Sequence, residues 1–282
     1  MLEVLLEVYP EQKKTRLKQF LKYGAVTVNG HTVSQFDYAL VRGDEILIRN
    51  YRPEFHHVAK PSLSFPIVYE DERLIVIEKP AGLLTMGNDK EKIQTAYFEL
   101  TAYARARTSD SSGRVFIVHR LDRDASGLLL FAKDEEMKLG LQANWERVEK
   151  KYYAVVEGCP DRPADTIESH LVASDKSMLV HSSQQTEHSK LARSSYVVLG
   201  SGKHYSLLEV ATFTGRKHQI RVQLADIGCP IVGDKKYGAQ TDPAGRLGLH
   251  AFHLAVQDPE SGEEHIFKSP LPQSLHLVRF KA

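Results

Sequence analysis

The feature that most constrains this chain is a charged, polar turn held between two short apolar runs. The runs cover residues 115–118 and 128–132, and each has the length of a buried strand. Between them stand several side chains capable of chemistry, namely His119, Arg120, Asp122, Arg123, Asp124 and Ser126. Functional groups concentrate on loops that rigid elements hold in place. We therefore expect this turn to carry the chemistry of the protein.

The residue types of this turn allow more than one interpretation. The opening of a calcium loop, D-x-D-x-S-G, is matched by Asp122, Asp124, Ser126 and Gly127. Such a loop needs a bidentate glutamate at its twelfth position, where this chain has Lys133, so calcium is not expected. An ordinary turn, with Asp124 and Ser126 bonded to their own backbone, explains the same residues. On these residues alone, a functional site and an ordinary turn are equally open.

Composition narrows the class of protein. A chain of 282 residues has room for one large domain or two unequal ones. Its net charge of +1 means that a partner rich in phosphate must be met by local basic patches. The chain has only two cysteines, Cys159 and Cys229, which argues against a disulfide framework, and neither lies in a C-x-x-C pair, which argues against a thiolate zinc site. No apolar run approaches the ~18 residues of a membrane span, and the acidic start is unlike a signal peptide, so we expect a cytoplasmic protein.

The first 50 residues predict a small domain with a basic helix. Leucines at helical spacing end at Pro10, and a second helix is expected over residues 13–23. Its cations form one exposed stripe, made of Lys14, Lys18 and Lys22 with Arg16 beside them. Such a stripe is most often only a solvated face. Asn29-Gly30 predicts a β-hairpin, and residues 51–66, with three prolines and no periodicity, predict a linker.

Residues 67–282 alternate between expected strands and helices. A buried strand at 74–77 breaks at the turn Lys79-Pro80-Ala81-Gly82, and a helix is expected over residues 90–107. A later helix begins with an accumulation of positive charge, from Arg216, Lys217 and Arg221. Cations at a helix start are unfavourable because of the helix dipole. We therefore expect them to have an anionic partner, either a carboxylate or a phosphate.

Four blocks of this region resemble, in order, the motifs of the RluA-type family of RNA pseudouridine synthases. They are E-D-x-x-L-I-V-x-E-K-P-A-G-L from residue 70, H-R-L-D-R-D-A-S-G-L from 119, K-x-Y-x-A-x-V-x-G from 150, and T-G-R-K-H-Q-I-R from 214. Glu78 stands where the family commonly has Asn, and Thr85-Met86-Gly87 replaces its V-H-P. The resemblance implies an α+β pseudouridine-synthase fold over residues 67–282, with a large mixed, mainly antiparallel sheet flanked by helices.

The same resemblance implies roles for individual residues. Asp122 matches the family's catalytic carboxylate, Arg221 the arginine that pairs with it, and Tyr152 the tyrosine that stacks on the target base. A tyrosine on a strand is most often a core residue, but a flat ring with a hydroxyl could both stack on uracil and transfer a proton. Contacts with the substrate are expected from His119, Arg120, Arg216, Lys217, His218 and Gln219, with Arg120 filling the stack that a flipped base leaves.

The N-terminal segment is similar to the S-four-like RNA-binding domain. The similarity rests on the order of a helix, a basic helix, G-A-V-T-V-N-G and R-G-D-E-I-L-I within residues 1–50. It implies that Lys14, Arg16, Lys18 and Lys22 contact RNA phosphates, which would supply affinity without reading sequence.

Together these resemblances predict an enzyme that isomerises specific uridines of structured RNA, with ribosomal RNA favoured over transfer RNA. The target would be flipped out of its stack, and Asp122 would attack either the sugar or the uracil ring. No cofactor and no metal are expected, because the chain has no Rossmann fingerprint, P-loop or metal cluster, and we expect a monomer. Two alternatives stay open: a non-catalytic RNA-binding or ribosome-assembly factor on a synthase scaffold, and a glycosylase that releases free uracil.

Overall fold

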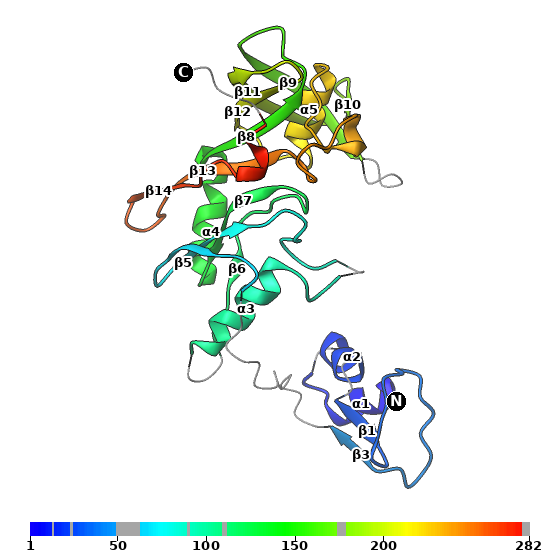
Figure 1. Cartoon of the computed structure of the whole chain (residues 1–282). Helices are drawn as coiled ribbons and strands as arrows, with labels where there is room; N and C mark the ends of the chain where they lie inside the picture. Colours follow the sequence, from blue (N-terminus) through cyan, green and yellow to red (C-terminus); the bar gives the residue numbers. More distant parts are fainter. Residues whose placement is uncertain are drawn as a thin grey trace. The chain divides into compact units, whose positions relative to one another are not determined.

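The computed structural model describes residues 1–12, 14–22, 25–48, 63–88, 91–108, 112–173 and 179–277. The chain divides into two compact units, residues 1–60 and 61–282 (Figure 1). The division lies within the stretch predicted as a linker, of which residues 51–62 are outside the described part of the chain. The assignment of residues 1–50 and 67–282 as functional domains stays a prediction.

The N-terminal unit packs two helices on a small antiparallel sheet. The helices are α1 (Leu2–Val8) and α2 (Lys14–Lys22), and the sheet has the order β2 (His31–Thr32), β1 (Val26–Val28), β3 (Ile46–Ile48). Its core comes from both helices and β1, chiefly Leu5, Leu17, Leu21, Val26 and Val28. The predicted hairpin is confirmed, since Asn29 and Gly30 connect β1 to β2 with φ angles of 49° and 81°.

Part of the predicted basic stripe on α2 can be located. Lys14 and Lys18 are exposed, and the Lys18 Nζ lies 5.9 Å from the centre of the Phe36 ring. The side chains of Arg16 and Lys22 lie outside what the structure describes. Contact of this stripe with RNA stays a prediction.

The second unit is built on a mixed sheet of eleven strands. Nine of them follow the order β10-β9-β11-β12-β8-β13-β7-β5-β4, while β14 pairs with β13 and β6 with β7. In chain order the strands are β4 (Ile67–Glu70), β5 (Leu74–Lys79), β6 (Phe116–Ile117), β7 (Ser126–Ala132), β8 (Glu149–Glu157), β9 (Ala164–Ala173), β10 (Val180–Ser183), β11 (Lys190–Ser201), β12 (Tyr205–Thr212), β13 (Leu249–Gln257) and β14 (Glu264–Lys268). Among the described pairings between these strands, only β7 and β13 run parallel. The predicted α+β, mainly antiparallel architecture is therefore confirmed.

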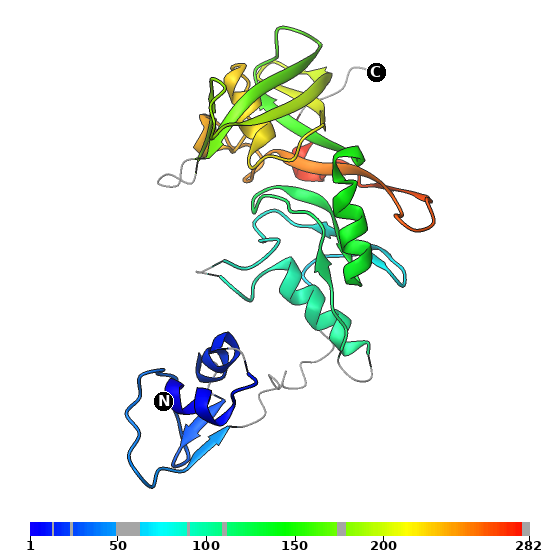
Figure 2. The ribbon, with the colours of Figure 1, turned by 180° about the vertical axis from the view of Figure 1, so that it is seen from behind.

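Helices cover both faces of the sheet at β7, as seen from two sides in Figures 1 and 2. α4 (Glu135–Ala143) packs on the face that carries Leu128 and Leu130. α3 (Ala96–Ala106) packs on the face that carries Leu129 and Phe131. Because successive strand residues point to opposite faces, covering both faces leaves every residue of β7 buried. The turn that precedes β7 is thus anchored to the most deeply buried strand of the unit.

α5 (Gln219–Asp226) lies at the other end of the sheet. Its Ile220 and Leu224 pack with Ala154, Leu208 and Val210 of β8 and β12. Three short 3-10 segments complete the unit, at Trp145–Arg147, Lys235–Tyr237 and Gln273–Leu275. The start of α5 and the turn before β7 therefore meet beside the central strands β8 and β13. In the described part of the chain, no helix has both the length and the apolar character to cross a membrane.

We predict that Gly127→Ala destabilises the second unit by roughly 3 kcal/mol or more. Gly127 has φ +113°, and a Cβ there would lie 2.2 Å from the Ala251 oxygen and 2.6 Å from its nitrogen. Strands β7 and β13 would have to separate at their parallel pairing. Gly202→Ala is the matched control, because its Cβ would meet nothing closer than the Tyr205 oxygen at 3.6 Å. Thermal unfolding measures both variants, and equal melting temperatures would contradict the prediction.

Candidate active site

The candidate site is a small pocket of about 90 Å³ where three segments of the second unit converge. The turn before β7 contributes Asp122, β8 contributes Tyr152, and the start of α5 contributes Arg221. These segments are far apart in sequence, and the sheet order brings them together because β8, β13 and β7 are neighbours. The three residues predicted to be catalytic thus line one pocket.

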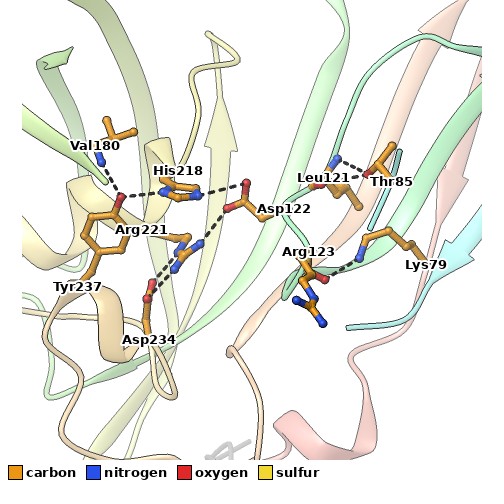
Figure 3. Close-up of polar contacts among 10 residues, drawn as sticks. All are labelled: Lys79, Thr85, Leu121, Asp122, Arg123, Val180, His218, Arg221, Asp234 and Tyr237. Carbon is orange, nitrogen blue, oxygen red and sulfur yellow. Dashed lines mark hydrogen bonds and ion pairs between the residues drawn. The ribbon is translucent and has the colours of Figure 1, made fainter. Parts of the chain in front are cut away.

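Arg221 makes the strongest polar contacts of the site (Figure 3). Its Nε and Nη2 donate to the two carboxylate oxygens of Asp234, each at 2.7 Å. Its Nη1 donates to Asp122 Oδ2 at 3.3 Å. Such a two-pronged pair fixes the plane of the guanidinium as well as its position. Arg221 is therefore locked by Asp234 and presents its remaining edge to Asp122.

The charge of Arg221 is secured by these partners. Burial by itself lowers the pKa of an arginine, but the hydrogen bonds and charge of Asp234, with the charge of Asp122, outweigh it and raise the pKa of Arg221. Both Arg221 and Asp234 are almost wholly buried. The site therefore keeps one fixed positive charge beside the Asp122 carboxylate, which is itself partly open to solvent.

His218 approaches the other oxygen of Asp122. Its Nε2 lies 4.0 Å from Asp122 Oδ1, and its Nδ1 lies 2.7 Å from the Tyr237 hydroxyl. That hydroxyl also accepts a hydrogen bond from the Val180 backbone N–H at 3.0 Å. The phenol proton is therefore directed to Nδ1, and we assign the imidazole proton to Nε2. Burial is the main cause that lowers the pKa of His218, so its ring is neutral at pH 7 and turns an N–H toward the carboxylate.

The backbone at His218 is also unusual. Its φ of 54° is in the left-handed region, which among the described non-glycine residues is shared only by Asn29. Such a conformation costs about 1–3 kcal/mol in a non-glycine residue. The surrounding contacts hold the residue in it, which supports a role for the position of this ring.

Tyr152 forms a flat wall of the pocket. It stands on β8, where its neighbours in the sheet are Val210 and Ala251. Burial, together with the charge of Asp122, raises the pKa of its phenol to about 12. The hydroxyl therefore keeps its proton near neutral pH, so that it can donate a hydrogen bond but is a poor base.

The turn that carries Asp122 is held from behind by two buried side chains. Lys79 is fully buried, and its Nζ donates to the carbonyls of Pro80, Leu83 and Arg123 at 2.8, 2.8 and 3.1 Å. Burial lowers the pKa of this lysine, while its three acceptors favour the ammonium form, the only form with three N–H donors.

Thr85 is the second support of the same turn. Its hydroxyl donates to the Leu121 carbonyl at 3.0 Å and accepts from the Leu121 N–H at 3.2 Å (Figure 3). Both the threonine and Leu121 are buried. The residue immediately before Asp122 is thus fixed at both of its backbone polar groups.

Three of the expected substrate contacts line the pocket beside His218. Arg120 is exposed, and Arg216 is exposed with its Nε bonded to the Leu191 carbonyl at 3.0 Å. Gln219 is buried, and its carboxamide bonds to the Ser194 hydroxyl and to the Arg216 N–H at 2.8 and 3.0 Å. Gln219 therefore shapes the pocket wall, while the two arginines are open to a ligand.

The structure does not bring His119 or Lys217 to this pocket. His119 Nε2 accepts a hydrogen bond from the Leu130 N–H at 3.0 Å, and its ring stacks on Trp145 with a centroid distance of 4.6 Å. Burial lowers the pKa of this histidine to about 3. Lys217 is exposed beyond the pocket lining. His119 thus packs beneath the turn as a neutral side chain.

Sequence reasoning gave no role in the site to Asp234, Tyr237 or Lys79, although all three lie in blocks that resemble the family's motifs. A signal for Asp234 was present, because cations at the start of a helix call for an anionic partner. That partner is a carboxylate 13 residues beyond Arg221. Among the described residues no group of three or more His, Cys, Asp or Glu side chains could hold a metal ion. The site is therefore a carboxylate between a fixed cation, a neutral imidazole and an aromatic wall.

Comparisons with known proteins show the family to which this chain belongs. The family model described as RNA pseudouridylate synthase matches residues 73–226. An uncharacterized RNA pseudouridine synthase of Bacillus subtilis is 33% identical over 270 residues, which cover 93% of this chain and 87% of the relative. The ribosomal large subunit pseudouridine synthase C of Rickettsia typhi is 31% identical over 286 residues, 95% of this chain and 92% of the relative.

A further relative and a solved structure extend the comparison. The ribosomal large subunit pseudouridine synthase D of Neisseria meningitidis is 31% identical over 292 residues, 98% of this chain and 76% of the relative. The structure of human RNA Pseudouridylate Synthase Domain Containing 4 superposes with a TM-score of 0.63 at 26% identity, covering 74% of this chain and 89% of that one. The chain belongs to the RNA pseudouridylate synthase family and is an isomerase that forms pseudouridine in RNA.

Proposed function

We propose that this enzyme converts uridine to pseudouridine in ribosomal RNA, with Asp122 as the catalytic carboxylate. The observation that carries the proposal is the arrangement of the pocket, in which Asp122 is the one acid among the described lining residues and faces Arg221 and Tyr152. The choice of ribosomal RNA is supported by relatives in Rickettsia typhi and Neisseria meningitidis that are named ribosomal large subunit synthases.

The chemistry suits a single carboxylate. The reaction breaks the bond between uracil N1 and the sugar, turns the base, and joins C5 to the sugar, so no electrons or net water are exchanged. Retaining glycosidases place two carboxyl groups about 5–5.5 Å apart across the bond. Here Asp124 lines a neighbouring pocket instead. Asp122 therefore acts alone, either on the sugar carbon or on the uracil ring.

The neighbours of Asp122 prepare it for this task. The guanidinium of Arg221 and the Nε2–H of His218 approach different oxygens of the carboxylate. These contacts orient the carboxylate and offset its negative charge before any substrate arrives. Tyr152 supplies a flat surface for the uracil, and its raised pKa suits stacking and hydrogen-bond donation rather than proton abstraction.

The size of the pocket supports base flipping. The Asp122 carboxylate is only partly open to solvent, in a small pocket that a base still stacked in an RNA helix cannot enter. The target uridine must therefore leave its stack to reach Asp122. Arg120, exposed beside the pocket, is suited to fill the vacated position.

Residues 1–50 are proposed to bind RNA phosphates through Lys14, Arg16, Lys18 and Lys22. The exposure of Lys14 and Lys18 on one helix supports this role. Phosphate contacts of this kind provide affinity and orientation.

No cofactor or metal is proposed, because the isomerisation is balanced without either. A monomer is also proposed. Ribosomal RNA as substrate also favours work in the cytoplasm.

We predict that Asp122→Asn lowers the rate of pseudouridine formation about a thousandfold or more. The amide cannot act as a nucleophile or stabilise a cationic sugar. Release of tritium from ribosomal RNA labelled at uracil C5 measures turnover, with transfer RNA as a second substrate pool. Asp124→Asn is the control and should keep its activity. Turnover by Asp122→Asn would overturn the assignment, and free uracil among the products would favour a glycosylase.

Asp234→Asn should destabilise the protein by about 3 kcal/mol and also slow turnover. The change leaves a buried guanidinium with a neutral partner, and breaking one side of a buried ion pair is costly. Asp161→Asn is a matched control on an exposed acid. Thermal unfolding and tritium release measure both effects. If Asp234→Asn were as stable as the wild type, the Asp234 carboxylate would not be needed to hold Arg221 in place.

Replacing both Lys14 and Lys18 by Gln should weaken RNA binding and flatten its dependence on salt. Each lost phosphate contact reduces the slope of log K against log salt by about 0.7–0.9. The double variant should therefore lose about 1.4–1.8 of slope, measured by titration of ribosomal RNA at several salt concentrations. Lys203→Gln with Lys268→Gln, at exposed lysines of the second unit, is the control. An unchanged salt slope would contradict the prediction that Lys14 and Lys18 of the N-terminal unit contact RNA phosphates.

A further inference from the structure

A second open groove, of about 790 Å³, lies on the catalytic unit outside the pocket of Asp122. We name it the α3 groove. Its lining includes the loop before α3, one side of α3, the approach to β6 and one residue of α4. Six of its residues carry the argument: Met86, Lys92, Tyr97, Arg105, Arg114 and Lys138.

The described residues of the α3 groove carry charge of one sign. Four of the described lining residues are cationic and none is acidic, in a chain whose net charge is only +1. The acid nearest in sequence to Lys92 is Glu91, and its Oε1 accepts from the Ile93 and Gln94 N–H groups, each at 2.9 Å. Backbone hydrogen bonds of this kind also lower the pKa of Glu91. Cations clustered in this way create a local field that attracts polyanions.

Apolar surface lies between these charges. Met86 is 42% exposed and Tyr97 is 38% exposed, although both are large apolar or aromatic side chains. A groove that offers cations to phosphates and flat or polarizable surfaces to bases matches the chemistry of single-stranded RNA. A basic surface that only contacts water would not need exposed apolar or aromatic side chains such as Met86 and Tyr97 beside its cations.

The α3 groove is joined to the catalytic turn through Thr85. The carbonyl of Thr85 accepts from the Tyr97 N–H at 3.0 Å, at the start of α3. Its hydroxyl holds both backbone groups of Leu121, the residue before Asp122. The position of Tyr97 relative to Asp122 is therefore fixed by hydrogen bonds through Thr85. A ligand bound on Tyr97 would lie at a defined position relative to the catalytic carboxylate.

The described residues of the loop before α3, 85–88 and 91–95, contact one another. The Asn88 N–H donates to the Glu91 carbonyl at 2.8 Å, and Asn88 Oδ1 accepts from the Glu91 N–H at 2.9 Å. A Cβ at Gly87 would lie 3.1 Å from the Glu91 oxygen. This loop contains Thr85-Met86-Gly87, the segment in which the sequence departs from its family's V-H-P. The departure thus falls on the residues that form the groove and tie it to the turn.

We propose that the α3 groove binds a single-stranded segment of the substrate RNA and so selects targets that have an unpaired stretch near the uridine. The inference rests on the RNA substrate proposed above. Phosphates would contact Arg114 and Lys138, and a base would stack on Tyr97. The groove adds affinity and selectivity and takes no part in bond breaking.

The charge contribution is tested with Arg114→Gln combined with Lys138→Gln in the full chain. The probe is a labelled, unstructured 15-nucleotide RNA, titrated at several salt concentrations, beside a duplex RNA of the same length. The double variant should bind the single strand more weakly, with a salt slope lower by about 1.4. Lys203→Gln with Lys268→Gln is the matched control and should behave as wild type. An unchanged slope, or a loss confined to duplex RNA, would overturn the proposal.

The stacking contribution is tested separately with Tyr97→Ala. Affinity for the single strand should fall roughly fivefold or more, with the salt slope unchanged, because stacking releases no counterions. Unchanged affinity would remove Tyr97 from the proposal. Melting temperatures of all variants should equal that of the wild type, since the altered side chains are at the surface.

Kinetics separate this inference from the proposed function. With ribosomal RNA as substrate, the double variant should raise KM several-fold and leave kcat unchanged, whereas Asp122→Asn lowers kcat. A lower kcat with unchanged KM in the double variant would overturn the proposal that the α3 groove binds substrate RNA. Failure of the wild type to release tritium from any RNA would overturn the proposed function, while the binding titrations would still decide the groove.

Discussion

The site depends on the buried pair between Arg221 and Asp234. Two ions removed from water cost several kcal/mol each unless they compensate one another with good geometry, and the two 2.7 Å hydrogen bonds provide that geometry. Because Asp234 accepts hydrogen bonds from Nε and Nη2 along one edge of the guanidinium, Nη1 is available to Asp122. If Asp122 were the only partner of Arg221, the guanidinium could move together with the Asp122 carboxylate and would not orient it. With Asp234 in place, the carboxylate is oriented by a charge that does not move.

The fold supplies the rigidity that this arrangement needs. β7 is buried on both faces by α3 and α4, and the preceding turn is fixed from behind by Lys79 and Thr85. On the opposite side, α5 is packed on β8 and β12 through Ile220 and Leu224. The reacting groups thus sit on elements whose own positions are set by the core, the condition under which preorganised electrostatics is effective.

Local patterns predicted many of the strands and helices, while the resemblance to the synthase family predicted the architecture and grouped Asp122, Tyr152 and Arg221 in one site. Side-chain direction was harder to predict. His119 stands three residues before Asp122 yet packs on Trp145, because neighbouring residues of a turn can point to opposite sides. The helix expected from residue 90 begins only at Ala96, since Glu91 takes the N–H groups of Ile93 and Gln94 into a turn. The pairing of Arg221 with Asp234 depends on how a loop returns, which periodicity does not encode.

Tyr237 connects the rim of the sheet to its catalytic centre. Its hydroxyl receives the N–H of Val180 on β10, the outermost strand, and its ring lies 5.0 Å from the Arg221 guanidinium carbon. The same hydroxyl sets which nitrogen of His218 carries the proton. Outer strands usually tolerate sequence drift, since few contacts depend on them. Here, the backbone of an outer strand determines a tautomer in the catalytic pocket, so an insertion or register slip at β10 would change the hydrogen bonding of His218 beside Asp122.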